Sequence, residues 1–338
     1  MNVDEDADTE QQHHEHTIRA FTAYRYHSLA SNNLRRQSYM SLQPHQQKLL
    51  PNQLQLINEI DYCITNNAEF LEDIAAAATA QALLQGGNSV LSKTIRPKPK
   101  VTEHEMEKLR STLRQIHRDW SEEGKSERDA SYEPILHALD AHYSHVSAAN
   151  RRNIRVLVPG CGLGRLAYEI ARKGYSAQGN EFSTFMLFSS NFILNATTAP
   201  HEFSIHPFCH SLSNTRVAND ATRAITIPDV LPRDVPEGTD FSMAAGDFCE
   251  IYRDEVGQWD CVATCFFIDT AHNIVEYLEV IASILKKGGL WINLGPSLWH
   301  FEGTIGLSLD LPMDEVKALA RRVPQGLQIE VSMVFITQ

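Results

Sequence analysis

The apolar residues in the N-terminal part of the chain recur with the period of a helix. In the stretch NQLQLINEIDYCITNNAEFLEDIAAAATAQALL, Ile57, Ile60 and Ile64 fall on one helical face, and the alanine run that follows has high helix propensity. A second stretch, MEKLRSTLRQIHRDW, carries another apolar stripe, made of Leu109, Leu113, Ile116 and Trp120. Residues 18–150 are therefore expected to form a helical N-terminal region.

The pattern changes from about residue 153, where short apolar runs alternate with helical stretches. The expected strands are IRVLVPG, YSAQGNE, FSMAAGDF, WDCVATCFFID and LWINLGP. The expected helices are LGRLAYEIARKG, FSTFMLFSSNFILN and NIVEYLEVIASILKKGG, the last capped by its glycines. Residues from about 196 to 240 are rich in Pro, Thr and Asn and are expected to be an insertion or long loop. The alternation predicts an α/β domain over residues 151–338, with a parallel sheet covered on both faces.

Composition narrows the classes of partner and location. The chain has 42 acidic and 30 basic residues and a net charge of −12, which argues against binding to nucleic acid or to an anionic membrane. The six cysteines show no CxxC or zinc-like spacing, so we expect reduced thiols of an intracellular protein and no metal site. Residues 1–17 are acidic and His-rich without an apolar core, and are expected to be a disordered tail rather than a signal peptide or membrane anchor.

A glycine-rich turn follows the first strand of the α/β region. Gly160, Gly162 and Gly164 stand in PGCGLGR, and Glu181 follows about 20 residues later at the end of the second strand. Such glycines let the backbone approach a ligand, and the acid can accept both hydroxyls of a ribose, so the pair predicts a nucleoside ligand. A dinucleotide turn reads GxGxxG, and the spacing here fits S-adenosylmethionine better. A nicotinamide-dependent dehydrogenase and a turn that serves only helix–strand packing remain alternatives.

Two later stretches favour a methyltransferase. GDF places Asp247 and Phe248 after the third strand, where an acid can bond the exocyclic amine of adenine and an aromatic ring can cover the base. LKKGGLWINLGP resembles the helix-to-strand turn that is common after the fourth strand of methyltransferases. In this order along the chain, the turn and the two stretches together predict a Rossmann-like methyltransferase domain.

Longer stretches resemble a narrower family, the carnosine N-methyltransferases. They are AYRYH, QQKLLP, QIHRDWSEEGKSERDASYEPI, VLVPGCGLGRLAYEIARKGYSAQGNEFSTFMLFSSNFILN, FSMAAGDFCEIY, WDCVATCFFIDTAHNIVEYLEVI and GGLWINLGPSLWHFEG, and they span roughly residues 20–305. The resemblance implies a class I methyltransferase sheet and transfer of a methyl group from S-adenosyl-L-methionine to an imidazole nitrogen of carnosine (β-alanyl-L-histidine), which gives anserine. Other histidine-containing peptides remain open as acceptors. The resemblance further implies a homodimer in the cytoplasm and the nucleus.

The resemblance also assigns residues to the site. Gln115 and Arg118, three positions apart on one helix, would reach the cofactor at its amino-acid end, although the helix alone favours a solvated polar face for them. The rest of the implied cofactor site consists of Gly160, Glu181, Asp247, Phe248 and Cys265. Asp269 and His300 would contact the dipeptide.

The positions of Asp269 and His300 allow a separate judgement. Asp269 follows an almost wholly apolar strand, where ligands bind in such sheets, but an Asp before a helix is also a common N-cap, so both roles stay open. His300 follows the next strand at the same end, with a structural role as its alternative. In the catalytic hypothesis, Asp269 accepts a hydrogen bond from one imidazole nitrogen and so directs the lone pair of the other nitrogen at the methyl group.

The end of the chain departs from the family pattern. The family continues through a helix and two final antiparallel strands, with tyrosines that help to enclose the substrate. Here MDEVKALARRVPQGLQIEVSMVFITQ predicts a helix and one strand. The C-terminal hairpin is therefore expected to be truncated, which would leave a sheet edge unpaired. This expectation keeps a non-catalytic, cofactor-binding scaffold open as an alternative to an enzyme.

Overall fold

The computed structural model describes residues 3–84, 101–324 and 327, with side chains from residue 12 onward. The chain divides into two compact units. The first contains Met1–Arg128 and Ser183–Arg233, and the second contains Asp129–Phe182 and Asp234–Gln338. The hydrophobic pattern predicts a boundary near residue 150 with residues 183–233 in the sheet domain, so the observed grouping differs from the expected one.

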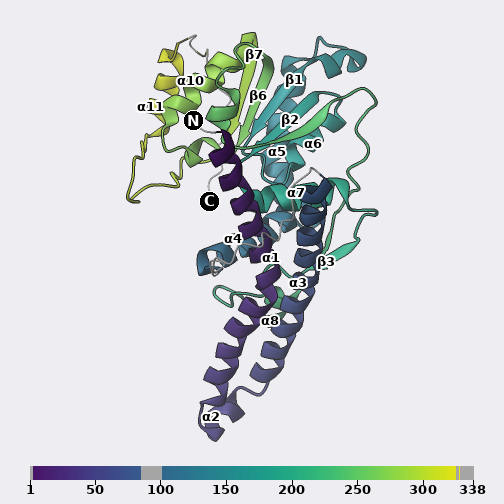
Figure 1. Cartoon of the computed structure of the whole chain (residues 1–338), viewed down its shortest axis with the longest axis vertical. Coiled ribbons are helices and arrows are strands. Elements are labelled where there is room, and N and C mark those ends of the chain that lie inside the picture. Colours follow the sequence, from purple (N-terminus) through teal and green to yellow (C-terminus); the bar gives the residue numbers. More distant parts are fainter. Residues whose placement is uncertain (1–2, 85–100, 325–326, 328–338) are drawn as a thin grey trace. The chain divides into compact units, whose positions relative to one another are not determined.

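Long helices make up most of the first unit. They are α1 (Val3–Met40), α3 (Gln53–Leu84) and α4 (Glu103–Trp120), and the short α2 (Pro44–Leu49) stands between α1 and α3. Figure 1 shows α1 and α3 side by side. The amide of Asn32 on α1 joins them by donating to the carbonyl oxygen of Ile57 and to Oδ1 of Asp61, each at 2.8 Å. Ile57, Ile60 and Ile64 are buried, as their helical spacing predicts.

The start of α1 differs from the expected disordered tail. Helix α1 begins at Val3, so most of residues 1–17 is helical. Thr17 is fully buried and its hydroxyl donates to the His13 carbonyl oxygen at 3.0 Å. His16 contacts the Glu105 carboxylate of α4. These tertiary contacts extend the helix into a stretch whose composition alone favours disorder, because packing outweighs the weak preferences of polar residues.

The segment after β2 packs against the N-terminal helices. It contains α7 (Thr184–Asn195), β3 (Phe203–Ile205), α8 (Ala218–Thr222) and β4 (Ile225–Ile227), and β3 pairs antiparallel with β4. The ring of Phe70 on α3 lies 5.7 Å from that of Phe192 and 5.2 Å from that of Phe203. The Asn67 side chain accepts a hydrogen bond from the His206 backbone nitrogen at 2.7 Å. The expected insertion thus holds a small sheet of its own.

A parallel sheet forms the centre of the second unit, as the alternation predicts. Its strands are β1 (Arg155–Pro159), β2 (Ser176–Glu181), β5 (Phe241–Ala245), β6 (Trp259–Cys265) and β7 (Leu285–Leu294). Their order is β5-β2-β1-β6-β7, and every pairing is parallel. The expected α/β fold with a helical N-terminal region is confirmed.

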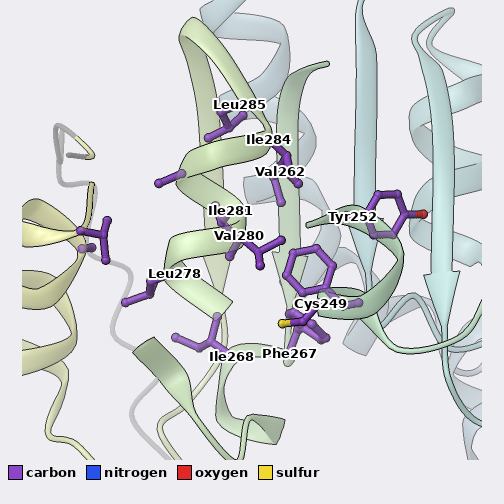
Figure 2. Packing of buried hydrophobic residues seen from close by; sticks show 14 of the residues in the cluster. Cys249, Tyr252, Val262, Phe267, Ile268, Leu278, Val280, Ile281, Ile284 and Leu285 are labelled. Carbon is purple, nitrogen blue, oxygen red and sulfur yellow. The ribbon is translucent and has the colours of Figure 1, made fainter. Parts of the chain in front are cut away.

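Alternate residues of the central strands enter two separate cores, which is why both faces of the sheet are covered. Val156, Val158 and Cys261 pack on one face with α5 (Lys125–His142) and α6 (Arg165–Arg172). Leu157 and Val262 pack on the other face with α9 (Phe248–Tyr252), α10 (Ile274–Ile284) and α11 (Met313–Arg322). Figure 2 shows the side chains of α10 gathered beside Val262 in this second core. Period-two alternation in β1 and β6 therefore specifies both layers.

Near the C-terminus, one helix ends earlier than the sequence pattern predicts, and some expected elements lie outside the described residues. Helix α10 ends at Ile284 rather than at its glycines, because the backbone of Leu285 is already extended and pairs with Trp259 at the start of β7. Helix α11 matches the expected C-terminal helix. The expected strand after it, and the expected truncation of the hairpin, lie outside the described residues. Within the described ranges, no helix combines the length and the apolar character needed to cross a membrane.

Candidate active site

The carboxyl ends of the parallel strands bring several predicted site residues of the second unit to one edge of the sheet. Pro159 is level with Asn180, Glu181 with Ala245, and Cys265 with Leu294. Glu181 and Cys265 are the last residues of β2 and β6, and the segments that follow the strands carry Gly160, Asp247, Asp269 and His300. Ligands of open α/β sheets bind outside this edge.

The glycine turn between β1 and α6 has a backbone that only glycine adopts easily. Gly160, Gly162 and Gly164 have φ of 60°, 55° and 78°. A Cβ atom at Gly160 would lie 2.4 Å from Cδ2 of Phe267, so a side chain does not fit there. The Cys161 nitrogen donates to the Asn180 carbonyl oxygen at 3.0 Å and ties the turn to β2. The turn therefore presents bare backbone, which suits close approach of a ligand.

Glu181 is fixed beside this turn. Its Oε2 accepts a hydrogen bond from the Gly162 nitrogen at 2.8 Å, and its Oε1 accepts one from the Phe182 nitrogen at 3.0 Å. The Gly246 nitrogen donates to the Glu181 carbonyl oxygen at 2.9 Å, which joins the end of β2 to the loop after β5. A carboxylate has about four lone-pair positions, so these backbone bonds are compatible with the hydroxyls of a ribose.

Asp247 and Phe248 have structural contacts that the sequence did not reveal. Asp247 is the N-cap of α9, and its Oδ1 accepts hydrogen bonds from the nitrogens of Cys249 and Glu250 at 2.8 and 3.1 Å. Phe248 is buried, and its ring meets that of Phe267 edge to face at 5.5 Å. The adenine contacts predicted for this pair stay predictions.

The turn after β6 contains an exposed aromatic residue that the sequence analysis did not single out. Cys265 is half-buried, Phe267 is buried, and Phe266 between them is 41% exposed. Phe266 has φ of 53°, which is uncommon for a bulky residue and marks a strained backbone at the ligand edge. The signal available in the sequence was the pair of phenylalanines at the end of an apolar strand, since only one of two successive side chains can face the same core.

Asp269 is a buried acid at this edge, within the short helix η2 (Ile268–Thr270). It is 3% exposed, and among the atoms of the described residues its Oδ1 is buried without a hydrogen-bond partner. Burial raises the pKa of its carboxyl, while the nearby His300 and backbone hydrogen bonds oppose the rise. The alternative that Asp269 caps the next helix is wrong, because Asn273 is the N-cap of α10 and accepts from the Val275 nitrogen at 3.2 Å.

His300 and Asp269 lie together. The His300 nitrogen donates to the Asp269 carbonyl oxygen at 3.0 Å, and its ring Nδ1 is 3.1 Å from the same oxygen. The residue is otherwise exposed. The backbone of the loop after β7 is thus tied to the acid that follows β6.

Gln115 and Arg118 belong to the first unit and contact each other on α4. The Arg118 guanidinium donates to Oε1 of Gln115 at 2.5 Å, and the Gln115 amide donates to Oδ2 of Asp119 at 2.9 Å. Gln115 and Arg118 are half-buried, whereas Asp119 is buried. The contact between Gln115 and Arg118 agrees with their spacing of three positions on one helix, and Asp119 is a partner of both that their spacing did not indicate.

Known proteins match this chain over most of its length. The family model of carnosine N-methyltransferase matches residues 96–338. The chain is 42% identical over 334 residues to carnosine N-methyltransferase of Mus musculus, covering 98% of this chain and 82% of that protein. It is 42% identical over 293 residues to carnosine N-methyltransferase of Schizosaccharomyces pombe, covering 84% and 76%.

One solved structure of another methyltransferase is a more distant match. Phosphoethanolamine N-methyltransferase 2 of Haemonchus contortus, solved with S-adenosyl-L-methionine, is 16% identical with a TM-score of 0.32, and the match covers 67% of this chain and 45% of that one. This likeness is too remote to bear on function. The family model and the curated relatives decide the assignment: the chain belongs to the carnosine N-methyltransferase family.

Proposed function

We propose that this protein transfers a methyl group from S-adenosyl-L-methionine to an imidazole nitrogen of carnosine. Membership of the family supports this reaction, and it supports neither a nicotinamide-dependent dehydrogenase nor a non-catalytic scaffold. One structural observation carries the proposal. The buried carboxylate of Asp269 has an oxygen without a partner among the described residues, and it lies at the sheet edge where a substrate would bind.

The bare backbone of the glycine turn fits the adenosine cofactor. The turn from Gly160 to Gly164 would hold it through close backbone contact, and Glu181 would accept hydrogen bonds from its ribose hydroxyls. Gln115 and Arg118 would hold its amino-acid end, and Asp247, Phe248 and Cys265 complete the proposed set. When bound, the cofactor supplies an electrophilic methyl group on a sulfonium.

The acceptor imidazole needs orientation more than it needs a base. Its reference pKa is about 6.5, so near neutral pH one nitrogen already carries a lone pair. Asp269 would accept a hydrogen bond from the other nitrogen through its unpartnered Oδ1, which selects the tautomer and stabilises the imidazolium that forms. His300 would contact the dipeptide beside it. A carboxylate held in a buried position acts strongly here, because it does not have to reorganise as the positive charge develops.

Replacement of Asp269 tests this mechanism. Asp269→Ala should lower kcat with carnosine by about a hundredfold or more, since both tautomer selection and charge stabilisation are lost. The affinity for S-adenosylhomocysteine, measured by calorimetry, should change by less than about threefold.

The exposed Asp254 provides a matched control, and Asp254→Ala should leave both quantities unchanged. The proposed role is wrong if Asp269→Ala methylates carnosine at a rate within a few-fold of the parent.

Product, assembly and location extend the proposal. We infer that the product is anserine and that the protein acts as a homodimer in the cytoplasm and the nucleus, on the support of the family resemblance alone. Liquid chromatography with tandem mass spectrometry, run against both methylcarnosine isomers, tests the first statement. Light scattering on the purified chain tests the dimer, and imaging of a tagged chain in cells tests the location.

A further inference from the structure

A buried carboxylate on α4 contacts both residues that are proposed to hold the amino-acid end of the cofactor. Asp119 is 1% exposed. Its Oδ2 accepts the hydrogen bond from the Gln115 amide at 2.9 Å, and its Oδ1 lies 3.6 Å from Nε of Arg118. Because Arg118 also donates to Gln115, the three side chains form a closed set of contacts within one turn of the helix.

The backbone beneath this set is held by a second buried group. One guanidinium nitrogen of Arg128 donates to the carbonyl oxygens of Arg118 and Ser121 at 2.8 and 2.6 Å. Another donates to Oδ2 of Asp229 at 2.6 Å, and both side chains are almost fully buried. The Asp229 nitrogen in turn donates to the Trp120 carbonyl oxygen at 2.9 Å. These hydrogen bonds hold the backbone at the end of α4, which carries the side chains of Gln115 and Arg118.

That restraint has a physical value for binding. Gln and Arg are among the side chains that lose most rotamer freedom when they are immobilised. A ligand that had to order both side chains would bind more weakly by the free energy of that lost rotamer entropy. Side chains that are ordered before the ligand binds lose little entropy on binding. A buried carboxylate is itself costly without a cationic partner, and Arg118 provides one for Asp119 at 3.6 Å.

We propose that Asp119 is a positioning residue for the cofactor, which holds Gln115 and Arg118 in the orientation that receives the amino-acid end of S-adenosylmethionine. This inference rests on the proposed function of those two residues. Asp119 acts through them and does not contact the ligand. Its loss therefore weakens cofactor binding and leaves the chemical step at saturating cofactor nearly unchanged.

Conservative replacement separates positioning from folding. Asp119→Asn keeps an acceptor for the Gln115 amide and removes the charge beside Arg118, so the dissociation constant of S-adenosylhomocysteine should rise about tenfold. The KM for S-adenosylmethionine should rise in parallel, with kcat within about threefold of the parent. Asp119→Glu keeps the charge but displaces the carboxylate by one methylene, and the same criteria apply to it if the Asn variant does not fold.

The control uses another acid near Arg118. Glu127 lies 3.7 Å from NH1 of Arg118 and is 62% exposed. An exposed ion pair contributes little, so Glu127→Gln should change the dissociation constant by less than about twofold. Equal losses for Glu127→Gln and Asp119→Asn would overturn the inference, because they would reflect only the overall charge around Arg118.

A double-mutant cycle with Arg118→Met distinguishes the two levels of the proposal. If Asp119 acts through Arg118, Asp119→Asn should cost much less affinity in the Arg118→Met background than in the parent. If the two losses simply add, Asp119 has no positioning role, while the cofactor role of Arg118 stands. If Arg118→Met alone leaves the affinity for S-adenosylhomocysteine unchanged, the proposed cofactor role of Arg118 fails and the inference about Asp119 fails with it.

Discussion

Asp269 is a buried acid at the end of the sheet where ligands bind. Its ionised form suits a binding role but lowers the stability of the folded protein. Burial raises the pKa of its carboxyl above the ordinary value, so the ionised form costs the folded protein free energy near neutral pH. Residues that serve a reaction are often held in such unfavourable states. In the proposed mechanism, the positive charge of the imidazolium would offset this cost.

This opposition predicts how stability depends on pH. The unfolded carboxyl has a pKa of about 3.9, and the folded one is higher, so between these values the folded state binds more protons and the free energy of unfolding falls as pH rises. Asp269→Asn lacks this term. The difference in unfolding free energy between variant and parent should therefore move in favour of the variant from about pH 4 upward and level off above the folded pKa. Urea unfolding at several pH values measures it, and a difference independent of pH would contradict the burial argument.

Individual residues show how far sequence reasoning reaches. The left-handed backbone of Gly160 and the position of Glu181 beside the glycine turn could be predicted, because both follow from the geometry of one strand–turn–helix unit. The capping role of Asp247 could not be predicted in the same way. It depends on the residue at which α9 begins, and a sequence pattern places a helix end only to within one or two residues. Asp119 was not predicted to be buried, because its burial depends on how α4 packs. A charged residue three or four positions from other polar residues on a helix is usually exposed to solvent.

At the scale of elements, the turn from β1 to α6 depends on the absence of a side chain at its first glycine. Gly160→Ala would place a methyl group 2.4 Å from Phe267 in a backbone with φ of 60°. We expect the free energy of unfolding to fall by about 1–3 kcal/mol and the affinity for S-adenosylhomocysteine to fall at least about tenfold. Thermal unfolding and calorimetry measure the two effects.

Gly257 provides the matched control for this change. It has φ of 63°, and nothing lies within 4 Å of a Cβ atom built there. Gly257→Ala should show the backbone strain alone, without a steric clash and without loss of cofactor affinity. Equal effects of the two substitutions would mean that Phe267 moves aside and that the turn is not tightly packed.

Helices and strands were predicted best where the hydrophobic pattern within the segment alone determines its structure. Strands β1, β2 and β6 and helices α3, α6 and α7 match stretches recognised from their hydrophobic pattern. The end of α10 was misplaced, because the pairing of Leu285 with Trp259 extends β7 toward the helix before the glycines are reached. Contacts between residues distant in sequence overrode a local stop signal.

At the scale of the whole molecule, the chain leaves the sheet unit after β2 and returns to it before β5. Residues 183–233 group with the N-terminal helices instead. Hydrogen bonds such as those between Asn67 and His206 produce this grouping, and they join positions 139 apart in the chain. A pattern read along the sequence has no access to such pairings, which is why the segment was expected to belong to the sheet domain.

Net charge gives a prediction for the molecule as a whole. With a formal charge of −12, the chain should repel polyanions at most of its surface. Fluorescence anisotropy with a short labelled DNA duplex or RNA at about 150 mM salt should show no binding at micromolar protein. Saturable binding that weakens steeply with added salt would reveal a basic surface that the total charge conceals.

The strand order β5-β2-β1-β6-β7 has a consequence for how such an enzyme can change. In the second unit, the proposed cofactor residues lie at the ends of β2 and β6 or just after β1 and β5, while Asp269 and His300 follow β6 and β7. Along the chain, the boundary between the two groups of residues lies in one short turn, between Cys265 and Asp269. Insertions or substitutions after this boundary could change which methyl acceptor binds without altering the proposed cofactor residues before it. New acceptors could therefore arise from changes in the two loops that follow β6 and β7.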